Sequence, residues 1–436
     1  MLEPADANAV ATAPDDAPQP NASDTTTAPI TATSATPTPP TPDAPHSRQT
    51  PFPWHRVPLL VLALCALIVG LDAATILLGL PAPVTTDRLP EVHGMLMVIG
   101  FVGTLIALER AVALRRAAAF LSPILLGVGA LLLVTPLPLR TGQLLMVGGS
   151  AVLVAIYVPL WQRRPDDAVT VQALGAVLAL GATVLWLGEL DIARLLPWLV
   201  GFVVLTIGGE RLELARIHIG ANQGARLVAL SMLLAGAIIA TTFTDLAYPL
   251  VGLALLTLGG WLAVRDVARR TIHSQGLPRF TAACLLSGYA WIGVAGSEWM
   301  AGGVHIDSPA YDVVVHATFL GFTISMILAH APVILPAILR RPLPYHPAML
   351  VPAGLLQASL IVRLWLGDGL GWHAAWQMGG LLNVVSLLGF VGVTVWAAQR
   401  AKHATHMRRT THTPHATNAP QTLSQPHPIA DRRAQA

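Results

Sequence analysis

The chain has 436 residues, of which 54% are hydrophobic and only 11% carry a charge, and its net charge is +3. A soluble globular domain has about 25% charged residues, so this composition excludes an ordinary cytosolic enzyme. The basic residues stand mostly in short segments between apolar runs, where they determine membrane topology. We therefore expect no binding of nucleic acid.

Disordered tails are predicted at both ends of the chain. Residues 1–50 consist largely of Ala, Pro, Thr and Asp, a composition that buries too little apolar surface to offset the chain entropy. They contain no basic stretch followed by an apolar one, so we expect no cleaved signal peptide. We assign residues 1–55 to an N-terminal tail and residues 401–436, rich in His and Arg, to a C-terminal tail.

A transmembrane domain is predicted over residues 56–400. Its apolar runs are about 17–25 residues long, the length that an α-helix needs to cross ~30 Å of hydrocarbon. The sequence thus predicts an all-α polytopic membrane protein, with the lipid bilayer as its surroundings. The twelve expected helices cover residues 58–80, 92–114, 117–136, 142–161, 169–187, 192–213, 225–243, 246–264, 281–301, 311–339, 347–366 and 374–397.

The basic residues alternate between the two sides of the predicted membrane domain. One side receives most of the arginines, while the other receives only Arg88, Arg140, Arg194 and the borderline Arg363. The positive-inside rule places the basic side in the cytoplasm. We therefore expect both termini in the cytoplasm and, in a bacterium, a location in the inner membrane.

Three of the expected helices share a sequence pattern, Gly-Phe-x4-Ile-x2 followed by Glu or His. It begins at Gly100, Gly201 and Gly321, on the second, sixth and tenth helices. Sites in membrane proteins often lie where internal repeats meet, although a chance match among few residue types is the alternative. The constant distance of four helices predicts three four-helix units around a pseudo-threefold axis, covering about residues 56–165, 166–265 and 280–400.

Glu109, Glu210 and His330 occupy the last position of this pattern, near the predicted cytoplasmic ends of their helices. Arg110 and Arg211 directly follow the two glutamates. An ionisable side chain within a bilayer costs several kcal/mol unless it is paired, hydrated or bound to a ligand. Two interpretations stay open: a proton or ion relay formed by Glu109, Arg110, Glu210 and Arg211, or ion pairs that anchor helix ends.

Two histidines, His93 and His316, lie near the predicted outer ends of the second and tenth helices. Met97 follows His93 by one helical turn, and imidazole and thioether groups are good ligands for haem iron and copper. We therefore expect a metal centre at His93, Met97 and His316. His330, ~21 Å further along its helix than His316, is a candidate ligand for a cofactor in the other leaflet. A hydrogen bond to a neighbouring helix is the alternative for each histidine.

Short motifs on the second, sixth and tenth helices are similar to motifs of a known family, and they read His93-Gly94-Met95, Gly208-Gly209 with Arg211, and His316-Ala317. On them the chain resembles the NnrS family, twelve-helix bacterial membrane proteins that carry haem and copper and are linked to nitric oxide tolerance. The resemblance implies haem and copper as cofactors and nitric oxide as a small gaseous ligand. Glu210 interrupts the Gly-Gly-Arg motif of the family in this chain.

The expected architecture is also similar to that of the main subunits of haem–copper oxidases, which hold ligand histidines on helices 2, 6 and 10. Oxidase chemistry needs six such histidines, and this sequence offers only three at membrane depth. We therefore expect neither a terminal oxidase nor a nitric oxide reductase.

Three functions remain open at this point. The first is a haem- and copper-binding membrane protein with a role in nitric oxide or respiratory metabolism. The second is a proton- or cation-coupled transporter that uses Glu109, Glu210 and His330. The third is an assembly or scaffold protein that binds no cofactor.

Overall fold

The structure is a computed structural model that describes residues 54–215, 222–303, 306, 308–340 and 344–411. The predicted tails lie outside these residues, except for residues 54–55 and 401–411. Every regular element in the described part of the chain is helical. Eleven of the helices are long and apolar enough to cross a membrane, and the shorter apolar helix over Ala117–Leu133 lies at the place of the third expected helix. The predicted all-helical, polytopic fold is confirmed at this level.

The helices follow one another in the order that the apolar runs predict. Two short elements, η1 (Trp54–Arg56) and α10 (Ala268–Thr271), stand apart from the apolar helices. The apolar helices are α1 (Val57–Leu77), α2–η2–α3 (Arg88–Met95, Leu96–Gly103, Thr104–Leu114), η3–α4 (Ala117–Phe120, Leu121–Leu133), α5 (Leu139–Arg163), α6 (Asp167–Leu187), α7 (Ile192–Ala215), α8 (Gln223–Thr241), η4–α9 (Asp245–Ala247, Tyr248–Arg265), α11 (Leu277–Gly302), α12–η5–α13 (Pro309–His316, Ala317–Ile324, Ser325–Leu339), η6–α14–η7 (Pro347–Met349, Leu350–Leu360, Ile361–Gly369) and α15 (His373–Thr411).

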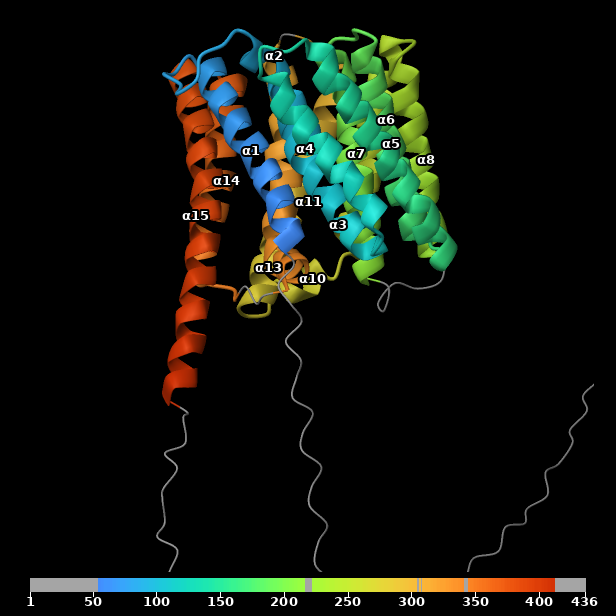
Figure 1. The fold of residues 1–436 in the computed structure, drawn as a ribbon. Helices are drawn as coiled ribbons and strands as arrows, with labels where there is room; N and C mark the ends of the chain where they lie inside the picture. Colours follow the sequence, from blue (N-terminus) through green and yellow to red (C-terminus); the bar gives the residue numbers. More distant parts are fainter. Residues whose placement is uncertain (1–53, 216–221, 304–305, 307, 341–343, 412–436) are drawn as a thin grey trace, which may run out of the picture. The chain divides into compact units, whose positions relative to one another are not determined.

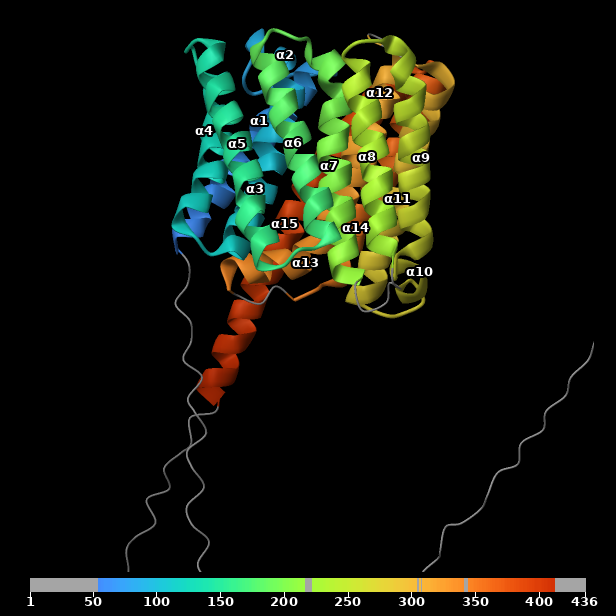
Figure 2. The same cartoon turned by 90° about the vertical axis from the view of Figure 1, so that its right-hand side faces the viewer.

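The helices run side by side, with α8 and α15 at opposite sides of the bundle (Figures 1 and 2). The start of α1 and the end of α15 lie at the same end of the bundle (Figure 1). α15 continues to Thr411, whereas the sequence predicts that its helix ends at residue 397. The extension contains neither Gly nor Pro, so the helix has no local reason to end where its apolar part ends.

Three of the apolar helices contain a π-helical segment: η2, η5 and η7. The segment η2 includes Gly100 and Phe101, and η5 includes Gly321 and Phe322, whereas α7 stays α-helical through its own Gly-Phe pair. π-Helical turns are rare and occur frequently at functional sites. The second and tenth helices therefore share a local irregularity at the repeated motif, which the sixth lacks.

Glycine allows some helices to approach each other closely, as small residues do in membrane bundles. A Cβ atom at Gly252 of α9 would lie 2.3 Å from the backbone nitrogen of Met300 on α11. A Cβ atom at Gly260, two turns further along α9, would meet nothing within 4 Å. Of these two positions, therefore, only that of Gly252 requires a glycine for the packing of α9 against α11.

These two glycines make a matched pair for testing the packing of α9 against α11. We expect Gly252→Ala to lower the free energy of unfolding by about 1–3 kcal/mol, because α9 and α11 have to move apart. Gly260→Ala should instead leave stability unchanged or raise it by up to about 1 kcal/mol through helix propensity. Thermal unfolding in detergent measures both, and equal midpoints for the two variants would contradict the close packing.

Candidate functional site

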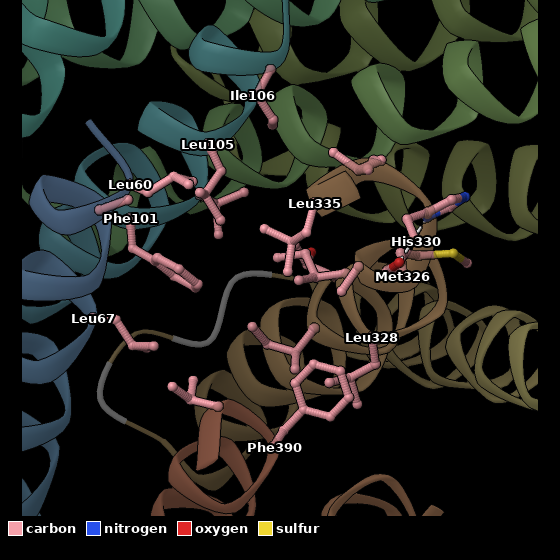
Figure 3. A pocket seen from close by; sticks show the side chains of 18 of the residues that line it. Leu60, Leu67, Phe101, Leu105, Ile106, Met326, Leu328, His330, Leu335 and Phe390 are labelled. Carbon is pink, nitrogen blue, oxygen red and sulfur yellow. Dashed lines mark hydrogen bonds between the residues drawn. The ribbon is translucent and has the colours of Figure 1, made fainter. Parts of the chain in front are cut away.

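A cavity of about 380 Å³ lies between α1, α3, α7, α13 and α15, with walls that are mostly apolar (Figure 3). Glu109, Glu210 and His330 all line it, although they come from three helices far apart in the sequence. The isoleucines of the repeated pattern line the same cavity, and these are Ile106, Ile207 and Ile327. The pattern thus identifies residues that meet in space.

Arg110 is surrounded by carboxylates. Its Nη2 donates to Glu109 Oε1 at 2.5 Å and lies 3.6 Å from Glu210 Oε1, while its Nη1 lies 3.6 Å from Glu213 Oε2. Nη1 also donates to Gln172 Oε1 at 3.0 Å. The side chains of Arg110 and Glu210 are 10% and 13% exposed, against 46% for Glu213. Three carboxylates therefore share one guanidinium, and two of these carboxylates belong to the cavity wall.

Arg211 belongs to a separate network. Its Nε and Nη2 donate to the two carboxylate oxygens of Asp266, each at 2.8 Å, and Tyr289 donates its hydroxyl to Asp266 at 2.6 Å. Burial alone would raise the pKa of Asp266, but the hydrogen bonds and charge of Arg211 hold it below its usual value. Arg211 is therefore neutralised by Asp266, and the predicted relay of two Glu-Arg pairs divides into two groups.

His330 has partners at both ring nitrogens. Its Nδ1 lies 2.7 Å from the backbone oxygen of Met326, and its Nε2 lies 3.0 Å from Arg211 Nη1. Since a carbonyl oxygen only accepts and a guanidinium only donates, Nδ1 carries the proton and Nε2 accepts. The ring is therefore neutral in this arrangement, and Nε2 is already used, so a cofactor ligated by His330 would have to displace Arg211.

The three residues predicted to form a metal centre, His93, Met97 and His316, line a second cavity of about 90 Å³. His93 Nδ1 lies 2.9 Å from the backbone oxygen of Gly70. His316 Nδ1 lies 3.0 Å from the backbone oxygen of Asp312. A proton on each Nδ1 satisfies these oxygens and leaves each Nε2 with a lone pair, which is the arrangement of metal-ligating histidines.

A partly buried ion pair holds His316 in place. Asp312 Oδ1 lies 3.1 Å from His316 Nδ1, and Arg363 donates to both oxygens of Asp312 at 2.8 Å. Trp376 donates from Nε1 to the same carboxylate at 3.3 Å, and its ring centroid lies 5.0 Å from the Arg363 guanidinium carbon. Asp312 and Arg363 thus orient a candidate ligand without being ligands themselves.

The second cavity suits a metal ion better than haem. At about 90 Å³ it is well below the roughly 300 Å³ at which pockets for organic ligands begin, so the haem macrocycle does not fit. Within the described part of the chain, no group of three or more His, Cys, Asp or Glu side chains could hold a metal ion. The donors at this cavity are two imidazoles and one thioether.

The sequence does not predict the roles of Gln172, Asp266, Tyr289 and the Asp312–Arg363 pair. Asp266 was open to detection, because it is the one acidic residue in a segment with Arg265, Arg269 and Arg270. The ion pairs themselves join residues about fifty positions apart, and no local pattern in the sequence reports such a distance.

Comparison with known proteins gives one family match. The model of the domain of unknown function DUF8744 matches residues 56–399, which is nearly the whole predicted transmembrane domain. Neither the curated proteins nor the solved structures contain a match to the chain.

The ion pair of Asp312 and Arg363 leads to a stability prediction. Arg363→Leu leaves a largely buried carboxylate without its partner and should lower the free energy of unfolding by about 3 kcal/mol, the lower end for a buried pair. Arg140→Leu is the control, because its pair with Glu189 is 71% and 77% exposed and contributes less than about 1 kcal/mol. Thermal unfolding in detergent compares them. Equal losses would show that Arg363 has no special role.

Proposed function

We propose that this protein, which belongs to the DUF8744 family, is a proton- or cation-coupled membrane transporter whose coupling site contains Glu109, Glu210 and His330. One observation carries the proposal: three helices that are distant in the sequence bring these side chains to the wall of a single cavity of about 380 Å³. Membrane transporters commonly bind coupling ions where their repeats meet.

The charges around the cavity support a coupling role. Arg110 is the cation next to Glu109, Glu210 and Glu213, while Arg211 is matched by Asp266 and His330 is neutral. An uncompensated carboxylate in an apolar environment is unfavourable by several kcal/mol. The excess negative charge therefore needs a proton or another cation, and exchange of one for the other at Glu210 is the elementary step of coupling.

The proposal includes the finer architecture that the repeat predicts. Three four-helix units around a pseudo-threefold axis would bring equivalent positions of the second, sixth and tenth helices together. The isoleucines and the polar residues of the pattern do line one cavity, which supports this arrangement. We also place the protein in the bacterial inner membrane with both termini in the cytoplasm, on the distribution of its basic residues.

Charge movement in reconstituted membranes tests the coupling site. A step in pH or in sodium concentration over proteoliposomes on a solid-supported membrane should give a transient current from the wild-type protein. Glu210→Gln should abolish this current, because an amide neither binds a proton in this range nor carries a charge. Glu189→Gln is the matched control, since Glu189 is exposed in its surface pair with Arg140.

Two results of this experiment would contradict the proposal. A wild-type current that Glu210→Gln leaves intact would remove Glu210 from the coupling site. The absence of any current after both kinds of step would contradict transport coupled to either cation.

The second cavity supports a second candidate function, the binding of one copper ion at His93, Met97 and His316. Two imidazoles and a thioether suit soft Cu(I), and both rings are held through Nδ1 with Nε2 left for a ligand bond. A role in nitric oxide or respiratory metabolism, which the NnrS resemblance implies, would use this ion. Haem is not part of this proposal because the cavity is too small for it.

Competition with a Cu(I) chelator in detergent tests this site. The wild-type protein should bind one more equivalent of Cu(I) than His93→Ala or His316→Ala, which should lower the affinity by about 100-fold or more. His273→Ala should match the wild type, because His273 is exposed in the segment between α10 and α11. Identical stoichiometry in all four proteins would contradict the site.

A further inference from the structure

The cavity of about 380 Å³ is far larger than a proton or a bare metal ion needs. We infer that its ligand is a lipophilic cation, an apolar organic molecule with one positive charge, which enters from the bilayer between α1 and α15. This inference rests on the proposed function, because it names the substrate class of the same site. The size, the walls, the charge and the access route each support it.

The walls of the cavity suit an organic molecule and not a hydrated ion. Besides Glu109, Glu210 and His330, the polar residues that line it are Thr323 and Thr394, and all others are apolar. A hydrated inorganic ion would have to lose its water against these mostly apolar walls, which offer few oxygen ligands in return. The volume falls instead in the range of about 300–1,000 Å³ typical of small organic ligands.

The charge of the walls selects a cation over an anion or a neutral molecule. Among the described residues, Glu109 and Glu210 are the acidic ones in the wall, and no Arg or Lys lines it. The nearest guanidiniums point their charge at carboxylates, Arg110 at the glutamates and Arg211 at Asp266. A positively charged group next to Glu210 would complete the pairing that Arg110 leaves incomplete.

The route of entry lies between two apolar helices. Leu60 and Leu64 of α1 and Val391 and Val395 of α15 line the cavity from either side, and Val395 is 51% exposed. Figure 1 shows that α15 diverges from α1 toward the end of the bundle where α13 ends. Since Val395 both lines the cavity and is exposed, the cavity borders the apolar surface of the bundle, where the surrounding solvent of a membrane protein is lipid.

A threonine hydroxyl in the cavity wall offers the ligand a further polar contact. Thr394 lines the cavity, and its Oγ1 is buried without a hydrogen-bond partner in the described part of the chain. Figure 3 shows Phe101 and Leu105 on one side of the open space and Leu335 and Phe390 on the other. Apolar and aromatic side chains thus surround the body of the ligand, while the carboxylates mark the place of its charge.

Carbodiimide labelling in lipid nanodiscs tests the inference with a pair of ions of equal shape. Tetraphenylphosphonium is a cation and tetraphenylborate is its anionic counterpart. A lipophilic carbodiimide modifies protonated carboxyl groups in apolar sites, so mass spectrometry of the Glu210 peptide reports its access. Tetraphenylphosphonium at about five times its dissociation constant should slow the labelling about six-fold, and tetraphenylborate at equal membrane concentration should not.

Two variants of α13 locate the effect. Leu335→Trp fills part of the cavity and should remove the protection by tetraphenylphosphonium while Glu210 is still labelled. Val333→Trp, at a position 56% exposed and outside the cavity wall, should keep it. Equal protection by both ions, protection by neither, or a Glu210 that the carbodiimide never modifies would each overturn the inference for the wild-type protein, whatever the variants do.

A failure of this inference can be distinguished from a failure of the proposed function. If the coupling site is correct and only the ligand class is wrong, the pH-step current that depends on Glu210 persists while tetraphenylphosphonium gives no protection. If the coupling site itself is wrong, the current does not depend on Glu210 in the first place.

Discussion

A carboxylate within an apolar membrane domain has to be neutralised, and much of this structure follows from how that is achieved. Asp266 accepts two hydrogen bonds of 2.8 Å from Arg211, and Asp312 accepts two of 2.8 Å from Arg363. In these two pairs one arginine binds both oxygens of one carboxylate, and each pair contacts a histidine. Arg110 is instead shared among three glutamates, two of which line a cavity.

This contrast separates carboxylates that have an arginine of their own from carboxylates that share one. A carboxylate that binds one arginine through both of its oxygens is neutralised by that arginine and gains little from a further cation. A carboxylate that shares its arginine with other carboxylates is not fully neutralised. Binding of a proton or a cation then changes the net charge of the group. Glu109 and Glu210, two carboxylates of this kind, belong to the cavity wall. The incompletely neutralised group therefore lies where there is also room for a ligand.

Sequence alone predicted the helices well and the site in part. The apolar runs predicted the order of the helices and approximately their number, because length and hydrophobicity decide whether a segment can cross a bilayer. The repeated pattern grouped Glu109, Glu210 and His330, and the structure brings these three residues to the wall of one cavity. The partners Asp266 and Arg363 were missed because they come from segments distant in the chain. The π-helical segments were also missed; they pack additional residues into a turn and so change which face a later side chain occupies.

The two cavities are neighbours, and Leu387 of α15 lines both. On one side of it the available donors are nitrogen and sulfur, from His93, Met97 and His316; on the other they are mainly carboxylate oxygens. Soft metal ions favour the first set and hard or organic cations the second. A single ion that passed through both cavities would find suitable ligands in only one of them. The ligand chemistry therefore favours two separate occupants, with Leu387 as the apolar wall between them.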